Sequence, residues 1–305
     1  MSNRLEPGYL TVQRCGILAR RAATAWEHMR ACDLCARYCR VDRIEGIKGA
    51  VCRTGERAVV HGYGAHHGEE DPLRGTRGSG TIFFSWCNLR CVYCQNWEIS
   101  HEGVGRQVTA EGLADIMLSL QHAGCHNVNL VSPSHVVAQI LAAVEIASER
   151  GLDVPLVYNT GGYDSLEALQ LLDGVVDIYM PDMKYDDPLL ARQYSKVRDY
   201  ASVNRTAVKE MHRQVGDLVL DENGIAVRGL LVRHLVLPNG VASTREVLTF
   251  LAEEISTDTY LNLMDQYRPC YRAGRHPPIA RRITSEEYER ALRLARNLGF
   301  TRLAD

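Results

Sequence analysis

This chain of 305 residues has little net charge and no long apolar run, and both absences narrow the possible functions. Its 35 Lys and Arg residues nearly balance its 37 Asp and Glu residues, so no basic field favours nucleic acid or an anionic membrane surface. No stretch approaches the ~18 consecutive apolar residues that a membrane span needs. The segment Met1–Glu6 also lacks the apolar core of a secretory signal. We therefore expect neither a nucleic acid nor a membrane among its partners.

Cysteine, in contrast, is plentiful. Ten cysteines in a chain without a signal indicate metal or redox chemistry in a reducing compartment and not disulfides. We therefore expect a cytoplasmic protein. Hydrophobic residues make up 46% of the sequence, which is enough to bury one large core and suits one main domain with an appendage.

Three of the cysteines form the most informative motif. Cys87, Cys91 and Cys94 are spaced Cys-x3-Cys-x2-Cys, with the aromatic Tyr93 just before the last of them. This spacing lets three thiolates of one tight loop bind three irons of a 4Fe-4S cube, so the fourth iron has no protein ligand. Three cysteines could instead bind zinc or be inert core thiols, but zinc normally recruits a fourth ligand nearby. The motif therefore predicts a cluster whose open iron binds a substrate or a cofactor.

From Thr81 onward, segments typical of strands alternate with segments typical of helices, which predicts a parallel, right-handed β/α sheet. The predicted strands are Thr81–Trp86, Asn127–Val131, Pro155–Tyr158, Val175–Met180, Leu230–Leu237 and Tyr260–Met264. The predicted helices are Ala110–Ala123, Val136–Glu149, Leu166–Leu172, Leu189–Tyr200 with Val203–Gln214, Thr244–Glu254 and Glu286–Leu298. The last helix begins with a capping-box pattern at Thr284–Glu287, and Asp217–Gly229 is predicted to form a hairpin before the fifth strand.

Six such strands predict an α/β fold, a partial (βα)6 barrel over residues 81–305. Residues 1–80 differ in character: a basic amphipathic helix is predicted around Thr11–Arg30, followed by a Cys- and Gly-rich metal-binding extension. We therefore expect an N-terminal extension and a barrel that carries a C-terminal helix.

Polar side chains follow the predicted strands, at the edge where chemistry gathers in parallel β/α folds. The candidates are Ser132, Ser134 and His135 after the second strand, Asn159 and Thr160 after the third, Asp182 and Lys184 after the fourth, Arg233 on the fifth, and Gln266 after the sixth. One such cluster alone is usually a helix cap or a turn, but five at one edge favour ligand contact. Cys270 follows the sixth strand, where it is either a plain loop thiol or a hydrogen-atom donor or extra cluster contact.

With these residues, the sequence from about residue 30 onward resembles the pyruvate formate-lyase activating-enzyme-like branch of the radical S-adenosylmethionine (SAM) superfamily, and within it the PflX-like subgroup. The matching segments are Gly78–Ser85, Cys87–Asn96, Tyr158–Tyr163, Met180–Lys184 and Met264–Pro269. The resemblance implies a radical SAM barrel in which Cys87, Cys91 and Cys94 ligate a 4Fe-4S cluster and SAM chelates the open iron.

The resemblance also implies roles for the strand-end residues. Ser132–His135 replaces the segment that contacts the SAM amino group in relatives, and Asn159 stands where relatives commonly have Asp. Asp182 and Lys184 match an Asp-x-Lys pair near SAM, and Arg233 matches an Arg close to the substrate. Tyr93, Thr160 and Gln266 complete the implied cofactor pocket. The sequence departs from the family at Trp86, where relatives usually have a small residue, and a bulky indole there would narrow or cover the cluster pocket.

A second set of cysteines lies in the extension: Cys32, Cys35, Cys39 and Cys52, spaced Cys-x2-Cys-x3-Cys-x12-Cys. A zinc ion held by four thiolates would staple a segment that is too short for a core of its own. An accessory 4Fe-4S cluster would instead feed electrons towards the first one. The spacing fits either group, and the compact, knuckle-like segment favours zinc.

The predicted function is that of a radical SAM enzyme, an activating-enzyme-like oxidoreductase. Reductive cleavage of SAM would give a 5′-deoxyadenosyl radical that abstracts hydrogen from a substrate, with an electron donor of flavodoxin or ferredoxin type as partner. The substrate would be a glycine or another residue of a protein or peptide, as for a glycyl-radical activase, or alternatively a small molecule. The alternative of another class is a non-catalytic iron–sulfur or zinc binding protein.

Overall fold

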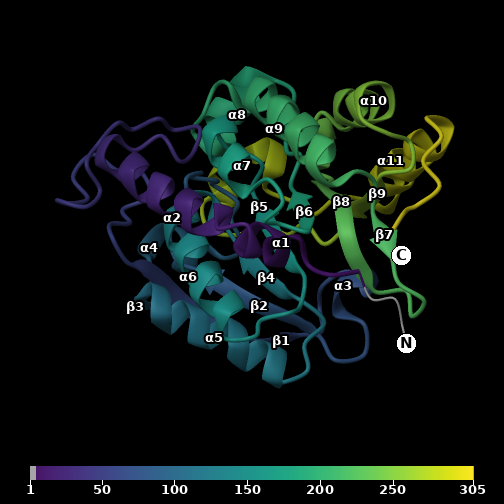
Figure 1. Cartoon of the computed structure of the whole chain (residues 1–305). Coiled ribbons are helices and arrows are strands. Elements are labelled where there is room, and N and C mark those ends of the chain that lie inside the picture. Colours follow the sequence, from purple (N-terminus) through teal and green to yellow (C-terminus); the bar gives the residue numbers. More distant parts are fainter. Residues whose placement is uncertain (1–4, 305) are drawn as a thin grey trace.

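The computed structural model describes residues 5–304, and a mixed sheet lies at its centre (Figure 1). Six neighbouring strands of this sheet are parallel: β2 (Ser79–Phe84), β4 (Val128–Val131), β5 (Leu156–Thr160), β6 (Ile178–Pro181), β8 (Ala226–Leu235) and β9 (Tyr260–Met264). Because β2 pairs with β1 on its outer side and not with β9, the sheet does not close. The predicted partial (βα)6 barrel is therefore confirmed. The prediction of a missing secretory signal falls mainly on residues 1–4, which lie outside the described residues.

Helices follow the parallel strands and cover the outer face of the sheet (Figure 1). They are α5 (Ala110–His122), α6 (Val137–Glu149), α7 (Leu166–Leu172), α8 (Pro188–Ser195), α9 (Tyr200–Val215), α10 (Thr244–Glu254) and α11 (Ser285–Asn297). Each coincides with a predicted helix to within a few residues. The capping box at Thr284 is present, with the Thr284 side chain accepting from the Glu287 amide and the Glu287 side chain accepting from the Thr284 amide.

Side chains alternate between the two faces of each parallel strand. On β5, Leu156 belongs to the main core beneath the helices, whereas Val157 belongs to a small cluster on the opposite, concave face. Leu231 of β8 lies in the same small cluster, together with Leu73 of the short helix α3 (Asp71–Arg74). Apolar side chains thus fill part of the concave face, and α3 contributes to this filling from outside the barrel.

The helix predicted around Thr11–Arg30 is wrong as a single element. The structure has two helices there, α1 (Gly8–Arg14) and α2 (Ile17–His28), followed by a 3-10 turn over Met29–Ala31. The break falls at Gly16, whose φ of 64° lies in the left-handed region that glycine adopts without strain. This break lets α2 pack along α6 and joins the extension to the main core.

The structure adds strands that the sequence pattern did not predict. β1 (Ala58–His66) and β3 (Arg106–Val108) extend the sheet in antiparallel pairing beyond β2. The pattern of β1 is weak because Gly62 and Gly64 interrupt it, and glycine disfavours strands. Through β1, part of the predicted extension shares the sheet of the barrel, while the division at residue 80 stays a prediction.

The predicted hairpin is present as β7 (Val219–Leu220) paired antiparallel with β8, although β8 begins at Ala226, four residues before the predicted Leu230. A further short helix, α4 (Trp97–Glu102), follows the loop that holds Cys87. None of the helices formed by residues 5–304 has the length and apolar character needed to cross a membrane.

Candidate active site

A cavity of about 440 Å³ opens at the carboxyl ends of the parallel strands. The concave-face side chains that line it are Phe83, Val131, Asn159, Asp182, Arg233, Leu235 and Met264, which come from the six parallel strands or the residues just after them. Alternation along each strand explains why these residues share the concave face, and Ser132 and Thr160 join the lining where β4 and β5 end. The carboxyl ends of these strands therefore share one cavity, as parallel β/α folds require.

The loop between β2 and α4 brings the thiols of Cys87, Cys91 and Cys94 to the same cavity. This loop is held by its apolar and backbone groups: Val92 is buried, and its amide donates to the Tyr194 carbonyl at 2.8 Å. Tyr93 is buried in a tyrosine-rich cluster, and its hydroxyl is hydrogen-bonded to that of Tyr185. Because apolar residues between the cysteines anchor the loop, the sulfurs are left to face the cavity.

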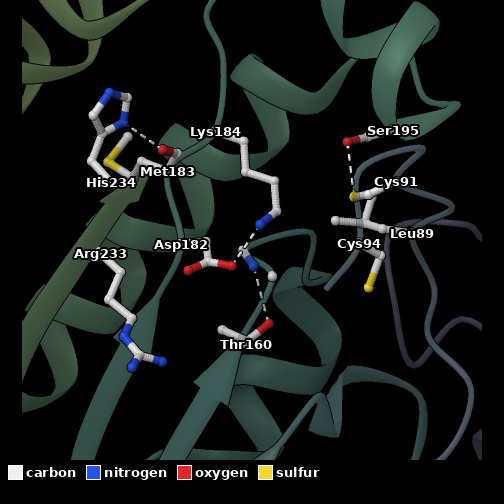
Figure 2. A network of polar contacts seen from close by, with 12 residues as sticks. Leu89, Cys91, Cys94, Thr160, Asp182, Met183, Lys184, Ser195, Arg233 and His234 are labelled. Atoms are coloured by element: carbon white, nitrogen blue, oxygen red, sulfur yellow. Dashed lines mark hydrogen bonds and ion pairs between the residues drawn. The ribbon is translucent and has the colours of Figure 1, made fainter. Parts of the chain in front are cut away.

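Each of the three sulfurs has a hydrogen-bonding neighbour. The Leu89 amide lies 3.4 Å from Cys87 Sγ, and the Ser195 hydroxyl lies 3.0 Å from Cys91 Sγ (Figure 2). A third hydroxyl, that of Ser100, lies 3.1 Å from Cys94 Sγ. Once the thiols are deprotonated, these groups can donate to the sulfurs, as hydrogen bonds to cluster ligands do.

Burial sets the charge state of these thiols. It raises the pKa of Cys87 to about 12 and also raises the pKa values of Cys91 and Cys94. Buried thiols of this kind become thiolates when a metal supplies the opposite charge. Three such thiols around one cavity, with donors to each sulfur, fit a 4Fe-4S cluster held by three cysteines. Within residues 5–304, no three His, Cys, Asp or Glu side chains form a group that could hold a metal ion, so neither cysteine set is arranged as a closed single-ion site.

Lys184 and Asp182 form an ion pair of 2.5 Å at the centre of the cavity (Figure 2). Burial by itself would lower the pKa of Lys184, but the Asp182 carboxylate, together with Cys91 and Tyr200, raises this pKa well above its usual value. These neighbours favour the ammonium form of Lys184. The backbone of Asp182 is fixed because its amide donates to the Thr160 carbonyl at 2.9 Å and its carbonyl accepts from Tyr200 and Asn204.

The cavity lining includes most of the residues that the sequence predicted for it. These are Cys87, Cys91, Tyr93, Cys94, Ser132, Asn159, Thr160, Asp182, Lys184, Arg233 and Gln266. The structure thus brings together residues from every predicted strand end, and their individual roles stay predictions.

Three predicted residues do not line this cavity. Ser134 and His135 belong to a 3-10 turn that directs them back into the sheet, where Ser134 Oγ lies 2.9 Å from Thr160 Oγ1 and His135 Nε2 lies 3.0 Å from the Ser85 carbonyl. Burial lowers the pKa of His135 to about 3, so its imidazole is neutral. Cys270 is partly buried in the loop after β9, also outside the lining.

Trp86 does not line the cavity either, contrary to the expectation that its indole narrows or covers the cluster pocket. Its φ of 69° lies in the left-handed region, which is rare for a residue with a side chain. The indole instead contacts two guanidinium groups, those of Arg53 at 5.2 Å and Arg90 at 5.8 Å from a ring centroid.

The sequence pattern missed an acidic part of the cavity wall. Glu69, in the segment between β1 and α3, lines the cavity and lies 3.0 Å from a guanidinium nitrogen of Arg233. Its neighbour Glu70 accepts from Arg233 Nε at 2.7 Å and from Asn262 Nδ2 of β9 at 2.7 Å. The only signal was a pair of glutamates after Gly68 in a segment remote from every strand end, so the sequence could not relate them to Arg233.

The four cysteines of the extension lie in a different environment. Cys32, Cys35 and Cys52 are buried, and Cys39 is partly buried. The fully buried Arg43 guanidinium lies 3.4 Å from Cys32 Sγ and donates to the carbonyls of Thr54 and His135 at 2.7 Å. None of these cysteines lines the cavity.

Comparison with known proteins identifies the superfamily. Residues 81–217 match the family model of the radical SAM superfamily. An uncharacterized protein of Methanocaldococcus jannaschii is 32% identical over 281 residues, which cover 90% of this chain and 77% of the relative.

Solved structures resemble the fold at low identity. Streptococcus suis SuiB, in a structure bound to precursor peptide SuiA, has a TM-score of 0.48 and 11% identity over 70% of this chain and 43% of SuiB. Methylornithine synthase (PylB) has a TM-score of 0.46 and 18% identity over 72% of this chain and 62% of PylB. TYW1 with a lysine–pyruvate adduct bound has a TM-score of 0.40 and 11% identity, over 72% of each chain. The match thus spans less than two thirds of SuiB and of PylB.

Proposed function

Since this chain belongs to the radical SAM superfamily, we propose that it cleaves SAM reductively at a 4Fe-4S cluster held by Cys87, Cys91 and Cys94. The observation that carries the proposal is that these three thiols share one cavity with the polar strand-end side chains. A purely structural or electron-transfer site needs no such polar cavity beside its thiols. This favours an enzyme over a non-catalytic iron–sulfur or zinc binding protein.

Cys87, Cys91 and Cys94 would hold the 4Fe-4S cluster, which would supply the one electron needed to cleave SAM into methionine and a 5′-deoxyadenosyl radical able to abstract hydrogen from the substrate. The chain's own residues bind SAM and orient it. The Lys184 ammonium, held on Asp182, suits the methionine carboxylate of SAM as a fixed positive charge. Asn159 and Thr160, at the end of β5, offer an amide and a hydroxyl for the polar parts of SAM.

The apolar side chains of the cavity limit the access of water. Phe83, Leu89, Leu235 and Met264 line it between the polar groups. A radical that abstracts hydrogen from an unactivated C–H bond has to be kept from side reactions, and an apolar lining favours this.

For the substrate, we propose a residue of a protein or peptide, as in glycyl-radical activases, with a small molecule as the alternative. The support is the resemblance of Cys87–Asn96, Tyr158–Tyr163 and Met180–Lys184 to the activating-enzyme-like branch and its PflX-like subgroup. An electron donor of flavodoxin or ferredoxin type would deliver the electron. The N-terminal cysteines would hold zinc or an accessory 4Fe-4S cluster.

The proposed function is tested by reconstituting the protein anaerobically with iron and sulfide and adding SAM and dithionite. Release of 5′-deoxyadenosine, measured by liquid chromatography, is the expected result. A protein that takes up about four irons but releases no 5′-deoxyadenosine would leave only the non-catalytic alternative.

The substrate class is tested in the same reaction run in deuterated water with cell extract fractions as substrate source. Stimulation of 5′-deoxyadenosine release by the macromolecular fraction supports a protein or peptide, whereas stimulation by the small-molecule fraction supports the alternative. A glycyl radical on a partner protein, detected by electron paramagnetic resonance, would identify an activase.

A further inference from the structure

The charges in the cavity wall do not balance. The ionisable side chains of the wall and its immediate support, apart from histidines and cysteines, are three carboxylates, on Glu69, Glu70 and Asp182, and two cations, Lys184 and Arg233. Lys184 is paired with Asp182, and Arg233 is shared by the two glutamates. If all five groups were ionised, one negative charge would be left over in a mostly buried place, where an unpaired charge is costly.

The two glutamates differ in position, because Glu69 lines the cavity and Glu70 lies behind it. Glu70 is the supporting member, since one of its oxygens accepts from both Arg233 and Asn262 and so ties the segment before α3 to β8 and β9. Glu69 contacts the Arg233 guanidinium and the side chain of Glu70, and it lines the cavity with a side chain that is only 6% exposed. Of the two carboxyl groups, only that of Glu69 lines the cavity, where a bound molecule can reach it.

Glu69 lies at the part of the cavity away from the thiols. Figure 2 shows Asp182 between the Arg233 guanidinium and the sulfurs of Cys91 and Cys94. Because Glu69 contacts the guanidinium of Arg233, it belongs to the side on which a substrate would lie if SAM is bound at the cluster.

We propose that Glu69 binds a protonated primary amine of the substrate. The inference rests on the proposed function, because it takes the molecule opposite the cluster to be the substrate. An ammonium group supplies the missing positive charge and donates to a carboxylate in a charge-assisted hydrogen bond. Burial raises the pKa of Glu69, although Arg233 lowers it, so in the empty cavity the carboxyl resists ionisation, which an arriving cation would favour.

Two kinds of molecule carry such an amine. One is a peptide, with a lysine side chain or a terminus, and the other is a small free amine. The test therefore uses the reconstituted protein saturated with SAM, without reductant, and four probes: n-pentylamine, pentan-1-ol, pentanoate and the peptide acetyl-Gly-Lys-Gly-amide. Saturation-transfer NMR measures their dissociation constants. The protein is expected to bind the amine at least tenfold more tightly than the alcohol, and the pentanoate more weakly than either. Tighter binding of the peptide than of pentylamine assigns the amine to a peptide, and the reverse order assigns it to a small molecule.

Glu69→Gln removes the charge at nearly constant shape and should bring the amine and the alcohol to within twofold of each other. Glu69→Asp keeps the charge on a shorter side chain and should retain a preference for the amine. Glu102→Gln, at an exposed carboxylate on α4, is the matched control and should bind like the parent. Thermal melts of all variants show whether a loss of preference comes from loss of folding. If Glu69→Gln does not fold, the binding of the amine and the alcohol to Glu69→Asp decides whether the proposal stands.

The proposal is overturned if the parent protein does not prefer the amine, or if Glu69→Gln keeps the preference. It is also overturned if Glu69→Gln mainly weakens SAM binding, because Glu69 would then serve SAM and not the substrate. Since these measurements involve no reductant and no SAM cleavage, their failure is distinct from failure of the proposed function, which a lack of 5′-deoxyadenosine would reveal.

Discussion

The two cysteine sets of this chain have similar spacing but different surroundings. The barrel set (Cys87, Cys91 and Cys94) faces a cavity of about 440 Å³ that polar side chains share. The N-terminal set (Cys32, Cys35, Cys39 and Cys52) is largely buried and faces no part of that cavity. An open cavity suits a cluster that binds a second molecule, whereas a closed environment suits a structural metal or an electron relay.

Each set also has a cationic side chain nearby, and the partner of that cation differs. Lys184, beside the barrel set, is neutralised by the Asp182 carboxylate. Arg43, beside the N-terminal set, has only carbonyl oxygens and Cys32 Sγ as hydrogen-bond acceptors in the described part of the chain. Burial would lower the pKa of Arg43, but Cys52 and Cys32 raise it. Because a buried charge needs a counter-charge, a metal held by the N-terminal cysteines as thiolates would supply the one that Arg43 lacks.

The two sets lie on either side of one arginine. Arg90, within the barrel loop, donates to the carbonyl of Val51, the residue before Cys52. Burial lowers the pKa of Arg90, while the thiols of Cys87 and Cys52 raise it. This link makes an electron relay from the N-terminal set to the barrel set a testable alternative to zinc.

The largest expected effect is the loss of SAM cleavage when a cysteine of the barrel set is removed. Changing Cys87, Cys91 or Cys94 to Ala should reduce 5′-deoxyadenosine release below detection, because each change removes one iron ligand. Chromatography of the quenched reaction and iron analysis measure this. Cys15→Ala, at an exposed cysteine outside both sets, is the control. If any of the three variants cleaves SAM at the parent rate, the cluster assignment is wrong.

The next effect concerns stability and metal content. Cys32→Ala should destabilise the protein by about 3–5 kcal/mol, because it leaves the Arg43 charge buried beside an incomplete metal site. Cys125→Ala, which also removes a buried thiol, should cost much less. Denaturant unfolding measures the difference, and equal costs for the two variants would argue against charged thiols at the N-terminal set.

Metal analysis of the parent protein sharpens the same comparison. We expect about one zinc beside about four irons per chain, with zinc drawing the N-terminal thiols together on binding. About eight irons without zinc would instead establish two clusters, with Arg90 between them.

A smaller effect tests the SAM side of the cavity. Lys184→Ala should weaken SAM binding by about 1–3 kcal/mol, the usual cost of a lost charge-assisted hydrogen bond, and leave the iron content unchanged. Equilibrium binding of SAM to the reconstituted protein measures this, with the exposed Lys48→Ala as control. Undiminished SAM affinity would mean that the SAM carboxylate binds elsewhere, and loss of iron would mean that Lys184 is structural.

The smallest effect concerns the hydrogen bond between Ser195 Oγ and Cys91 Sγ, which Ser195 would donate once the thiol is deprotonated. Ser195→Ala should make the reduction potential of the cluster more negative by about 40 mV, which corresponds to ~1 kcal/mol for one electron. The reason is that a donor to a thiolate stabilises the more negative, reduced cluster. Redox titration followed by electron paramagnetic resonance measures the shift, with Ser202→Ala on the surface of α9 as control. An unchanged potential would show that Ser195 does not donate to this sulfur.

Local patterns were enough to predict much of the fold. The strand Tyr260–Met264 and the helix Leu166–Leu172 coincide with the structure, and the capping box at Thr284 is where its residues indicated. The residues that form each of these patterns lie close together in the sequence, so the patterns can be recognised without knowledge of distant contacts. The break at Gly16 and the strand over Ala58–His66 were missed because packing, more than local preference, determines them.

The sequence by itself determined the thiol spacing of the barrel set and the order of the strands around it. The spacing of Cys87, Cys91 and Cys94 is set within one loop, and alternation along each strand determined which residues, among them Asp182, face the same side. Only the tertiary structure decided the rest of the site. The contact of Arg233 with Glu69 joins residues 164 positions apart, and the left-handed backbone at Trp86 turns its indole to Arg53 and Arg90 and away from the cavity lining. Such pairings depend on which surfaces the folded chain brings together, and spacing along the chain carries no record of them.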